Sequence, residues 1–216
     1  MSIPEDIEKI YEHLDHEVTK IHYNWDIFLQ LFGESEERIE LLNEVAPQFF
    51  LVVQNMAVEN LFLGISRLTD PYEQGRNKNW SLQAIPENLD VDQHQELRKE
   101  LSQEFDEIQS EVKPIRDRRN KIIAHFDEQA IVDEKLKKEL SASRGEIDRI
   151  LGRMGKYLNT FSKYFEDRRK YYSGVISIGD ANALMAFLKR GLKFEEMIQE
   201  RKIPYEEEQD LPYTCA

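Results

Sequence analysis

Cysteine is almost absent from this chain of 216 residues, in which Cys215 is the only one. A single cysteine excludes an intrachain disulfide bond and favours a reducing compartment. Glycine is also sparse, with 9 residues, and no glycine-rich phosphate-binding loop occurs. Internal repeats and convincing strand patterns are missing as well. These absences leave helical periodicity as the main structural signal.

An excess of basic residues is missing too. Lys and Arg total 29 against 42 Asp and Glu, so the net charge is −13. A chain this acidic is not expected to coat nucleic acid with its whole surface, and any such contact must be a local basic patch. The first ten residues are acidic, unlike a signal peptide, and the apolar run at 49–53 is far shorter than the ~20 residues of a spanning helix. We therefore expect a soluble cytoplasmic protein without membrane contact.

Apolar residues recur at intervals of three and four along nearly the whole chain, which predicts helices. The expected helices cover 3–32, 35–46 with a break at Pro47, 48–68, 91–126 with a bend at Pro114, 132–170, 180–188 and 193–202, with a loop at 70–90. This pattern predicts an all-α fold, an antiparallel bundle of about four long helices with short C-terminal helices. We expect residues 1–172 to form the bundle, and residues 173–216 to form a helical appendage and acidic tail packed on the same domain.

A cluster of cations lies just ahead of His125, within the run RDRRNKIIAHFD at 116–127. On an ideal helix, with about 100° per residue, Arg119 falls within about 60° of a series of apolar positions. These positions are Ile108, Val112, Ile115, Ile122, Ile123 and Phe126. A guanidinium in an apolar stripe destabilises the fold unless it pairs with an acid or lies at a hydrated interface. Arg119 is therefore expected at an interface, with His125 beside it at the helix end.

The remaining cations of the cluster, Arg116, Arg118 and Lys121, have an ordinary explanation. Solvated cations near the C-terminus of a helix complement its dipole, and a histidine there is a common feature. Arg119 fits this explanation less well, because a surface charge should not interrupt an apolar stripe.

Arg119 and Asn120, followed after four residues by His125, resemble the signature of the HEPN superfamily. The wider run RRNKIIAHFD resembles the abortive-infection branch, in which the histidine follows an alanine and an aspartate comes soon after. The run ISRLTD at 65–70, followed by a long loop, is also similar to that branch. The helical pattern from about residue 5 to residue 170 agrees with the antiparallel bundle of the superfamily.

The resemblance implies a metal-independent endoribonuclease without cofactors that leaves 2′,3′-cyclic phosphate ends, as in a toxin or an antiphage abortive-infection effector. His125 would act as general base or acid, Arg119 would hold the scissile phosphate, and Asn120 would orient it. Family members form homodimers in which two copies of the motif face each other across an RNA cleft. A nucleotidyltransferase-type antitoxin is a further possible partner. Asp127 stands where some toxins carry the tyrosine that such antitoxins modify, which argues against that mode of neutralisation.

Several other residues are weaker candidates for the same site. Arg116, Arg118 and Lys121 could extend the phosphate grip, and Arg153 and Lys156 on the fourth expected helix could form the rim of an RNA cleft. Such a cationic face is more often simply solvated.

Arg67, Asp70 and Asp127 are candidates for a supporting role. Arg67 or Asp70 could buttress Arg119, although a charge and an Asp-Pro turn at a helix end also explain the pair.

His13 and His16 lie one turn apart among acidic residues, a spacing that could bind a divalent metal. No second group of cysteines or histidines obviously completes a ligand set, so a solvated or partly packed helix face is the default and no metal is predicted. Three functions thus stay open. The first is an HEPN-type ribonuclease, and the second is a catalytically inactive helical module that binds RNA, a nucleotide or a protein. A metal enzyme built on His13 and His16 is the third.

Overall fold

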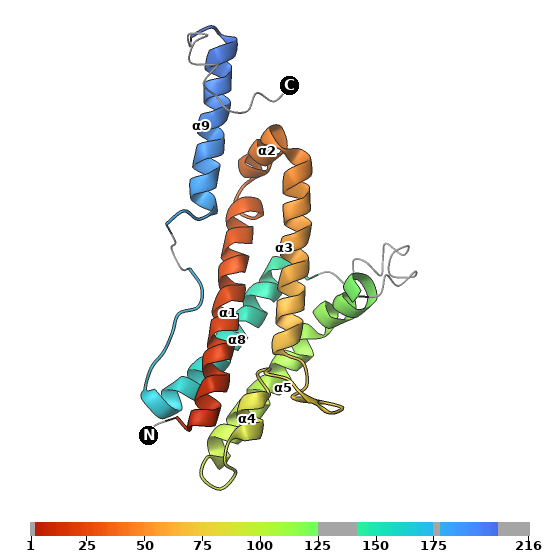
Figure 1. The fold of residues 1–216 in the computed structure, drawn as a ribbon, viewed down its shortest axis with the longest axis vertical. Coiled ribbons are helices and arrows are strands. Elements are labelled where there is room, and N and C mark those ends of the chain that lie inside the picture. Colours follow the sequence, from red (N-terminus) through yellow and green to blue (C-terminus); the bar gives the residue numbers. More distant parts are fainter. Residues whose placement is uncertain (1–2, 125–141, 175–177, 203–216) are drawn as a thin grey trace. The chain divides into compact units, whose positions relative to one another are not determined.

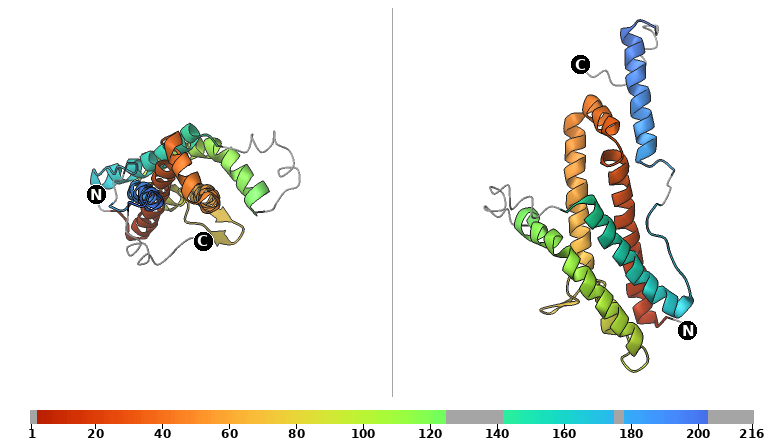
Figure 2. Two further views of the ribbon diagram at one scale, coloured as in Figure 1. Left: turned by 90° about the horizontal axis from the view of Figure 1, so that it is seen from above. Right: turned by 180° about the vertical axis from the view of Figure 1, so that it is seen from behind.

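The computed structural model describes residues 3–124, 142–174 and 178–202 (Figures 1 and 2). His125, Asp127, residues 132–141 and the tail from 203 onward, all of which figure in the predictions above, lie outside these ranges. The contacts divide the chain into two compact units, Met1–Asp26 with Asn55–Val175, and Ile27–Gln54 with Ile176–Ala216. The two units are described separately below as the first and second unit.

The first unit is built from long helices that surround one core. It contains α1 (Glu5–Phe32) as far as Asp26, α3 (Pro47–Leu68) from Asn55, β1 (Glu73–Gln74), β2 (Asn77–Lys78), α4 (Ala84–Asn88), α5 (Gln95–Arg118), a π-helical segment η1 (Arg119–Ala124) and α8 (Arg144–Glu166). Helix α1 runs antiparallel to α3, because Asn24 bonds Asn60 and Ile21 lies against Gly64. A Cβ on Gly64 would come within 2.7 Å of the Ile21 side chain, so the close approach of these two helices requires glycine.

Helix α8 closes the core of this unit by packing against both α1 and α5. Its side chains Tyr157, Phe161 and Leu158 are fully buried. The Tyr157 hydroxyl donates a hydrogen bond of 2.7 Å to the Leu82 carbonyl, which ties α8 to the segment before α4. Helices α5 and α8 lie side by side and antiparallel (Figure 1), joined by ion pairs such as Arg149 with Glu111.

The segment between α3 and α4, expected as a loop, contains a short antiparallel hairpin. Glu73 pairs with Lys78 and Gln74 with Asn77. Gly75 has a φ of +66°, the left-handed conformation that glycine adopts without strain in a tight hairpin turn. The expectation of no strand was wrong here, because two-residue strands carry no visible alternation of apolar and polar residues.

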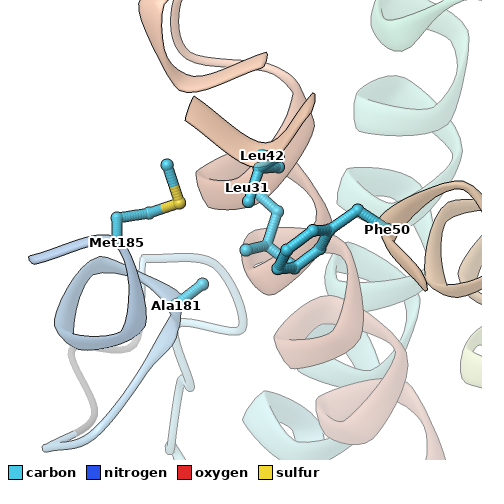
Figure 3. Close-up of a cluster of buried hydrophobic side chains, with 5 residues drawn as sticks. All are labelled: Leu31, Leu42, Phe50, Ala181 and Met185. Atoms are coloured by element: carbon cyan, nitrogen blue, oxygen red, sulfur yellow. The ribbon is translucent and has the colours of Figure 1, made fainter. Parts of the chain in front are cut away.

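The second unit contains the last residues of α1, α2 (Glu36–Val45), the first residues of α3, and α9 (Ala181–Gln199). Its core is the cluster drawn in Figure 3, which consists of Leu31, Leu42, Phe50, Ala181 and Met185. Asp180 caps α9, because its carboxylate accepts hydrogen bonds from the backbone N–H groups of Asn182 and Ala183.

The all-α fold class is confirmed, and most of the expected helices are present. The two expected C-terminal helices form the single helix α9, which continues through Gly191. A glycine within a helix lowers its stability but does not end it. The helix expected at 91–126 is α-helical only from Gln95 to Arg118 and continues as η1. The division into residues 1–172 and 173–216 stays a prediction.

Helix α3 is long and apolar enough to cross a membrane by length and composition. The sequence-based expectation did not anticipate this, because it considered only the run at 49–53. A third of the apolar window is buried inside the protein, and the core helix of a soluble protein meets the same criteria.

Candidate active site

Arg119 begins the π-helical segment η1, directly after the last residue of α5. Pro114, one turn before the end of α5, lacks a backbone N–H and so removes one hydrogen bond from the helix. A π-turn widens the helix and is frequent at functional sites. The spacing of about 100° per residue that describes an α-helix therefore does not apply beyond Arg118. The direction of the Arg119 side chain has to be taken from its tertiary contacts.

The main contact of Arg119 is with Asp70, which follows α3 and lies 49 residues earlier in the chain. The Arg119 Nη2 donates a hydrogen bond of 3.0 Å to Asp70 Oδ1, and both side chains are about three-quarters buried. A guanidinium in this setting needs a counter-charge, because burial without one is strongly destabilising. Asp70 supplies that charge and fixes the position of the Arg119 head.

The same carboxylate also binds Arg116. The Arg116 Nη2 lies 3.4 Å from Asp70 Oδ1 and donates to the Thr69 carbonyl, while its Nη1 donates to Gln109 at 3.0 Å. Gln109 itself donates to the Thr69 carbonyl. Burial lowers the pKa of Arg116 below its ordinary value, Asp70 opposes that effect, and Arg119 adds to it. The result is a pair of guanidiniums held side by side by one carboxylate, a local positive charge on an acidic protein.

Thr69 and Gln109 are the members of this cluster that sequence reasoning missed. Gln109 lies seven residues before Arg116, two helical turns away, so a shared helix face was the available signal. Nothing in the local pattern around Thr69 points to its carbonyl as an acceptor.

The remaining residues of the cationic run are placed differently. Arg118 lies over the ring of Phe62 on α3, with its guanidinium carbon 5.5 Å from the ring centroid. This is a cation–π contact, and the ion pairs of Asp70 within the described residues are with Arg116 and Arg119. Asn120 is exposed and Lys121 half-buried, both on η1 directly after Arg119. His125 and Asp127 lie outside the described residues.

Arg153 and Lys156, the candidates for the rim of an RNA cleft, form ion pairs between α8 and α5. Arg153 pairs with Glu107 at 2.5 Å and with Glu111 at 2.8 Å, and Lys156 pairs with Glu104 at 2.7 Å. Glu107 precedes Arg119 by twelve residues, about 18 Å along a helix. The structure therefore does not bring these two cations to Asp70.

Arg67 and His13, by contrast, line one cavity with Asp70. The ring of His13 contacts that of Trp80, with centroids 5.3 Å apart, while His16 is exposed. Among the residues that the structure describes, no group of three or more histidines, cysteines or acids could hold a metal ion.

Within the described part of the chain, Arg119 donates a hydrogen bond only through Nη2, and the Nε atoms of Arg116 and Arg119 have no hydrogen-bond partner. A guanidinium offers five donors, of which Asp70 engages few. Because both Nε atoms are buried, the donor capacity that remains for an anion lies in the Arg119 Nη groups that Asp70 does not engage. Arginine clamps phosphate through its planar fork, so the chemistry of the cluster suits a phosphodiester.

A comparison with protein families places the chain as a whole. A family model described as AbiU2, a HEPN family, matches residues 4–184. The chain belongs to this family. It is an abortive-infection-type HEPN domain, and members of the HEPN superfamily are generally ribonucleases. No curated protein and no solved structure matches the chain.

Proposed function

We propose that this AbiU2-family protein is a metal-independent endoribonuclease of the abortive-infection type, acting in the cytoplasm as a toxin or antiphage effector. The observation that carries the proposal is the clamp of Arg119 by Asp70 at the first residue of the π-helical segment, directly before Asn120 and the chain leading to His125. A phosphate-binding arginine held by a carboxylate from another element is preorganised for electrostatic stabilisation of a transition state.

In the proposed reaction, the ribose 2′-oxygen attacks the adjacent phosphorus and the bond to the 5′-oxygen breaks. His125 takes the proton from the 2′-hydroxyl or supplies one to the leaving 5′-oxygen, because histidine titrates near neutral pH. Arg119 binds the phosphate oxygens as negative charge grows on them, and Asn120 orients the same group. The products carry a 2′,3′-cyclic phosphate and a 5′-hydroxyl.

Purified protein should cleave RNA in the presence of EDTA and leave 2′,3′-cyclic phosphate ends. His125→Ala should reduce the rate by about 10²–10⁴-fold, and Arg119→Ala by about 10²–10³-fold. Arg190→Ala, which removes an exposed arginine on α9, is the matched control and should cleave at the wild-type rate. Activity that is lost in EDTA and restored by a divalent ion would instead indicate a metal enzyme.

A catalytically inactive module that binds RNA or a protein is the second candidate. The observation in its favour is that Asp70 pairs with both Arg116 and Arg119, an arrangement that also serves structure alone. RNA binding by the wild-type protein without cleavage, unchanged in His125→Ala, would support this candidate and contradict the first.

We further propose that the protein acts as a homodimer. The support comes from α3, where Phe49, Val52, Met56 and Leu63 follow one another at intervals of three, four and seven residues and therefore share a helix face. Phe49, Val52 and Met56 each expose more than half of their surface, and Leu63 exposes 38%. Exposed apolar residues in such a row are typical of helix–helix interfaces. Light scattering should give the mass of a dimer, and Met56→Glu should shift it to the monomer.

A further inference from the structure

A cavity of about 400 Å³ lies beside the Asp70 carboxylate in the first unit. Its walls come from α1, the end of α3 and the segment after β2. The residues that matter for its chemistry are His13, Lys20, Arg67, Asp70, Lys78 and Trp80. Its volume lies within the range of small-molecule sites. Asp70 both lines this cavity and binds Arg119, so the Asp70 side chain connects the cavity to the arginine pair, which does not itself line the cavity.

Trp80 is the aromatic surface of this cavity. Half of its side chain is exposed, at 51%, and its ring packs in an edge-on geometry against His13, at 66° between the ring planes. Its backbone is held on both sides, since the Asn79 N–H donates to the Tyr72 carbonyl at 2.7 Å and the Leu82 N–H donates to the Leu68 carbonyl at 2.8 Å. A large exposed ring on a fixed backbone is a preorganised stacking surface, on which a planar base loses little conformational freedom.

The cations of the cavity differ in how far they are already engaged. Lys20 bonds Glu17 at 3.0 Å, and Lys78 lies 5.1 Å from the Tyr72 ring centroid and 3.7 Å from Glu73. Within the described residues, the Arg67 guanidinium forms no hydrogen bond or ion pair. Arg67 is therefore the cation most available to a phosphate, which it can bind through two parallel hydrogen bonds.

The acids of the cavity limit what it can accept. Glu17 is bonded to Lys20, and Asp70 is bound by Arg119 and Arg116, so Arg67 is the cavity cation whose fork is open to one phosphate. A ligand with one planar ring and one phosphate fits both Trp80 and Arg67. A single nucleotide within a strand has this chemistry.

We propose that the cavity binds one unpaired nucleotide of an RNA strand, next to the phosphate held by Arg119, with the base on Trp80 and its phosphate on Arg67. This subsite rests on the proposed function for its ligand class. It makes single-stranded RNA the substrate, because a base within a duplex cannot reach the indole face. It also gives the protein a contact to the substrate that takes no part in bond cleavage.

Binding can be measured apart from cleavage with a short fluorescein-labelled 2′-O-methyl oligoadenylate, which lacks the attacking hydroxyl. Trp80→Ala should weaken its binding, measured by fluorescence anisotropy, by about 10- to 100-fold. Trp80→Phe, which keeps a stacking ring, should restore most of the affinity. Arg67→Gln should weaken binding and reduce its dependence on salt.

The matched controls are Phe187 and Arg190 on α9, an exposed aromatic ring and an arginine 5.6 Å from its centroid. Phe187→Ala and Arg190→Gln should bind like the wild-type protein. The double strand formed with a complementary 2′-O-methyl oligouridylate should bind more weakly than the single strand. Thermal melting of each variant, followed by circular dichroism, separates loss of the subsite from loss of the fold. If Trp80→Ala does not fold, the affinity of Trp80→Phe relative to the wild-type protein still tests the role of the ring.

The outcomes separate this inference from the proposed function. Wild-type cleavage of unmodified RNA, together with equal affinity of Trp80→Ala, Trp80→Phe and wild type for the oligoadenylate, overturns the subsite and leaves the ribonuclease proposal intact. A Trp80-dependent affinity without any cleavage supports the subsite and contradicts the ribonuclease proposal. Absence of binding by the wild-type protein overturns the subsite whatever the cleavage assay gives.

Discussion

Replacing Asp70 by asparagine tests whether the arginine pair depends on that carboxylate. Asp70 Oδ1 accepts hydrogen bonds from Arg119 at 3.0 Å and from Arg116 at 3.4 Å. Asparagine keeps the shape and one acceptor oxygen but removes the negative charge. The two guanidiniums then repel each other without a counter-charge between them, and Arg116 is already the more costly of the two because it is the more buried.

The expected loss of stability follows from how far the three groups are exposed. At about 4 Å, two opposite charges near a protein surface attract each other by about 4 kcal/mol, whereas fully exposed ion pairs contribute about 0–1 kcal/mol. The three side chains are exposed by 26%, 27% and 22%, so solvent screening reduces the larger figure without abolishing it. We expect Asp70→Asn to lower the free energy of unfolding by about 1–3 kcal/mol.

Tryptophan fluorescence during urea unfolding measures this change, because Trp25 and Trp80 both belong to the first unit. Glu73→Gln is the matched control. Its carboxylate is 67% exposed and lies 3.7 Å from Lys78, so its removal should change the unfolding free energy by less than about 0.5 kcal/mol.

The same measurement tests whether Asp70 holds Arg119 in place. If Asp70→Asn unfolds at the same urea concentration as the wild-type protein, the carboxylate does not restrain the guanidiniums, and the reasoning that places Arg119 through Asp70 is refuted. RNA cleavage by this variant gives an independent measure, since the proposed function requires a misplaced Arg119 to lower the cleavage rate.

Further predictions concern buried groups away from the site. Burial lowers the pKa of His22, which bonds the Leu151 carbonyl, below its ordinary 6.5, so the unfolded chain binds the proton more tightly. Stability should therefore be full above about pH 6.5 and fall as the pH drops towards the folded pKa, and urea unfolding at several pH values should show a shallower fall for His22→Gln. Tyr157→Phe should lower the free energy of unfolding by about 1–2 kcal/mol, measured in urea, because the Leu82 carbonyl loses its buried donor. Phe50→Ala should cost about 3–5 kcal/mol in the core of the second unit and speed amide hydrogen exchange in α2; unchanged exchange would contradict the packing in Figure 3.

Much of the fold was predictable from local signals. The apolar spacing and Gly33 bounded α1, and Pro47, expected to interrupt the helical run, begins α3. Asp180 was recognisable as the cap of α9 because a carboxylate before a helix accepts its free N–H groups. These predictions succeeded because each depends on a few neighbouring residues.

Predictions that assumed a regular helix over a long range were less successful. The stripe through Arg119 was drawn at about 100° per residue, but the chain becomes π-helical at Arg119 itself. Arg153 and Lys156 looked like a free cationic face, because their partners Glu107, Glu111 and Glu104 lie on another helix. Side chains on separate helices meet only once the helices are packed.

The sequence by itself determined that the protein is helical and where most helices begin and end, and it predicted that Arg119 needs a partner. Family resemblance added the chemistry expected of Arg119, Asn120 and His125. Only the tertiary structure decided that the partner is Asp70, that Arg116 shares it, and that a cavity with Trp80 opens beside it. The physical reason is that helix formation depends on neighbouring residues, whereas a charge pair spanning 49 residues of chain exists only after α3 and α5 have packed together.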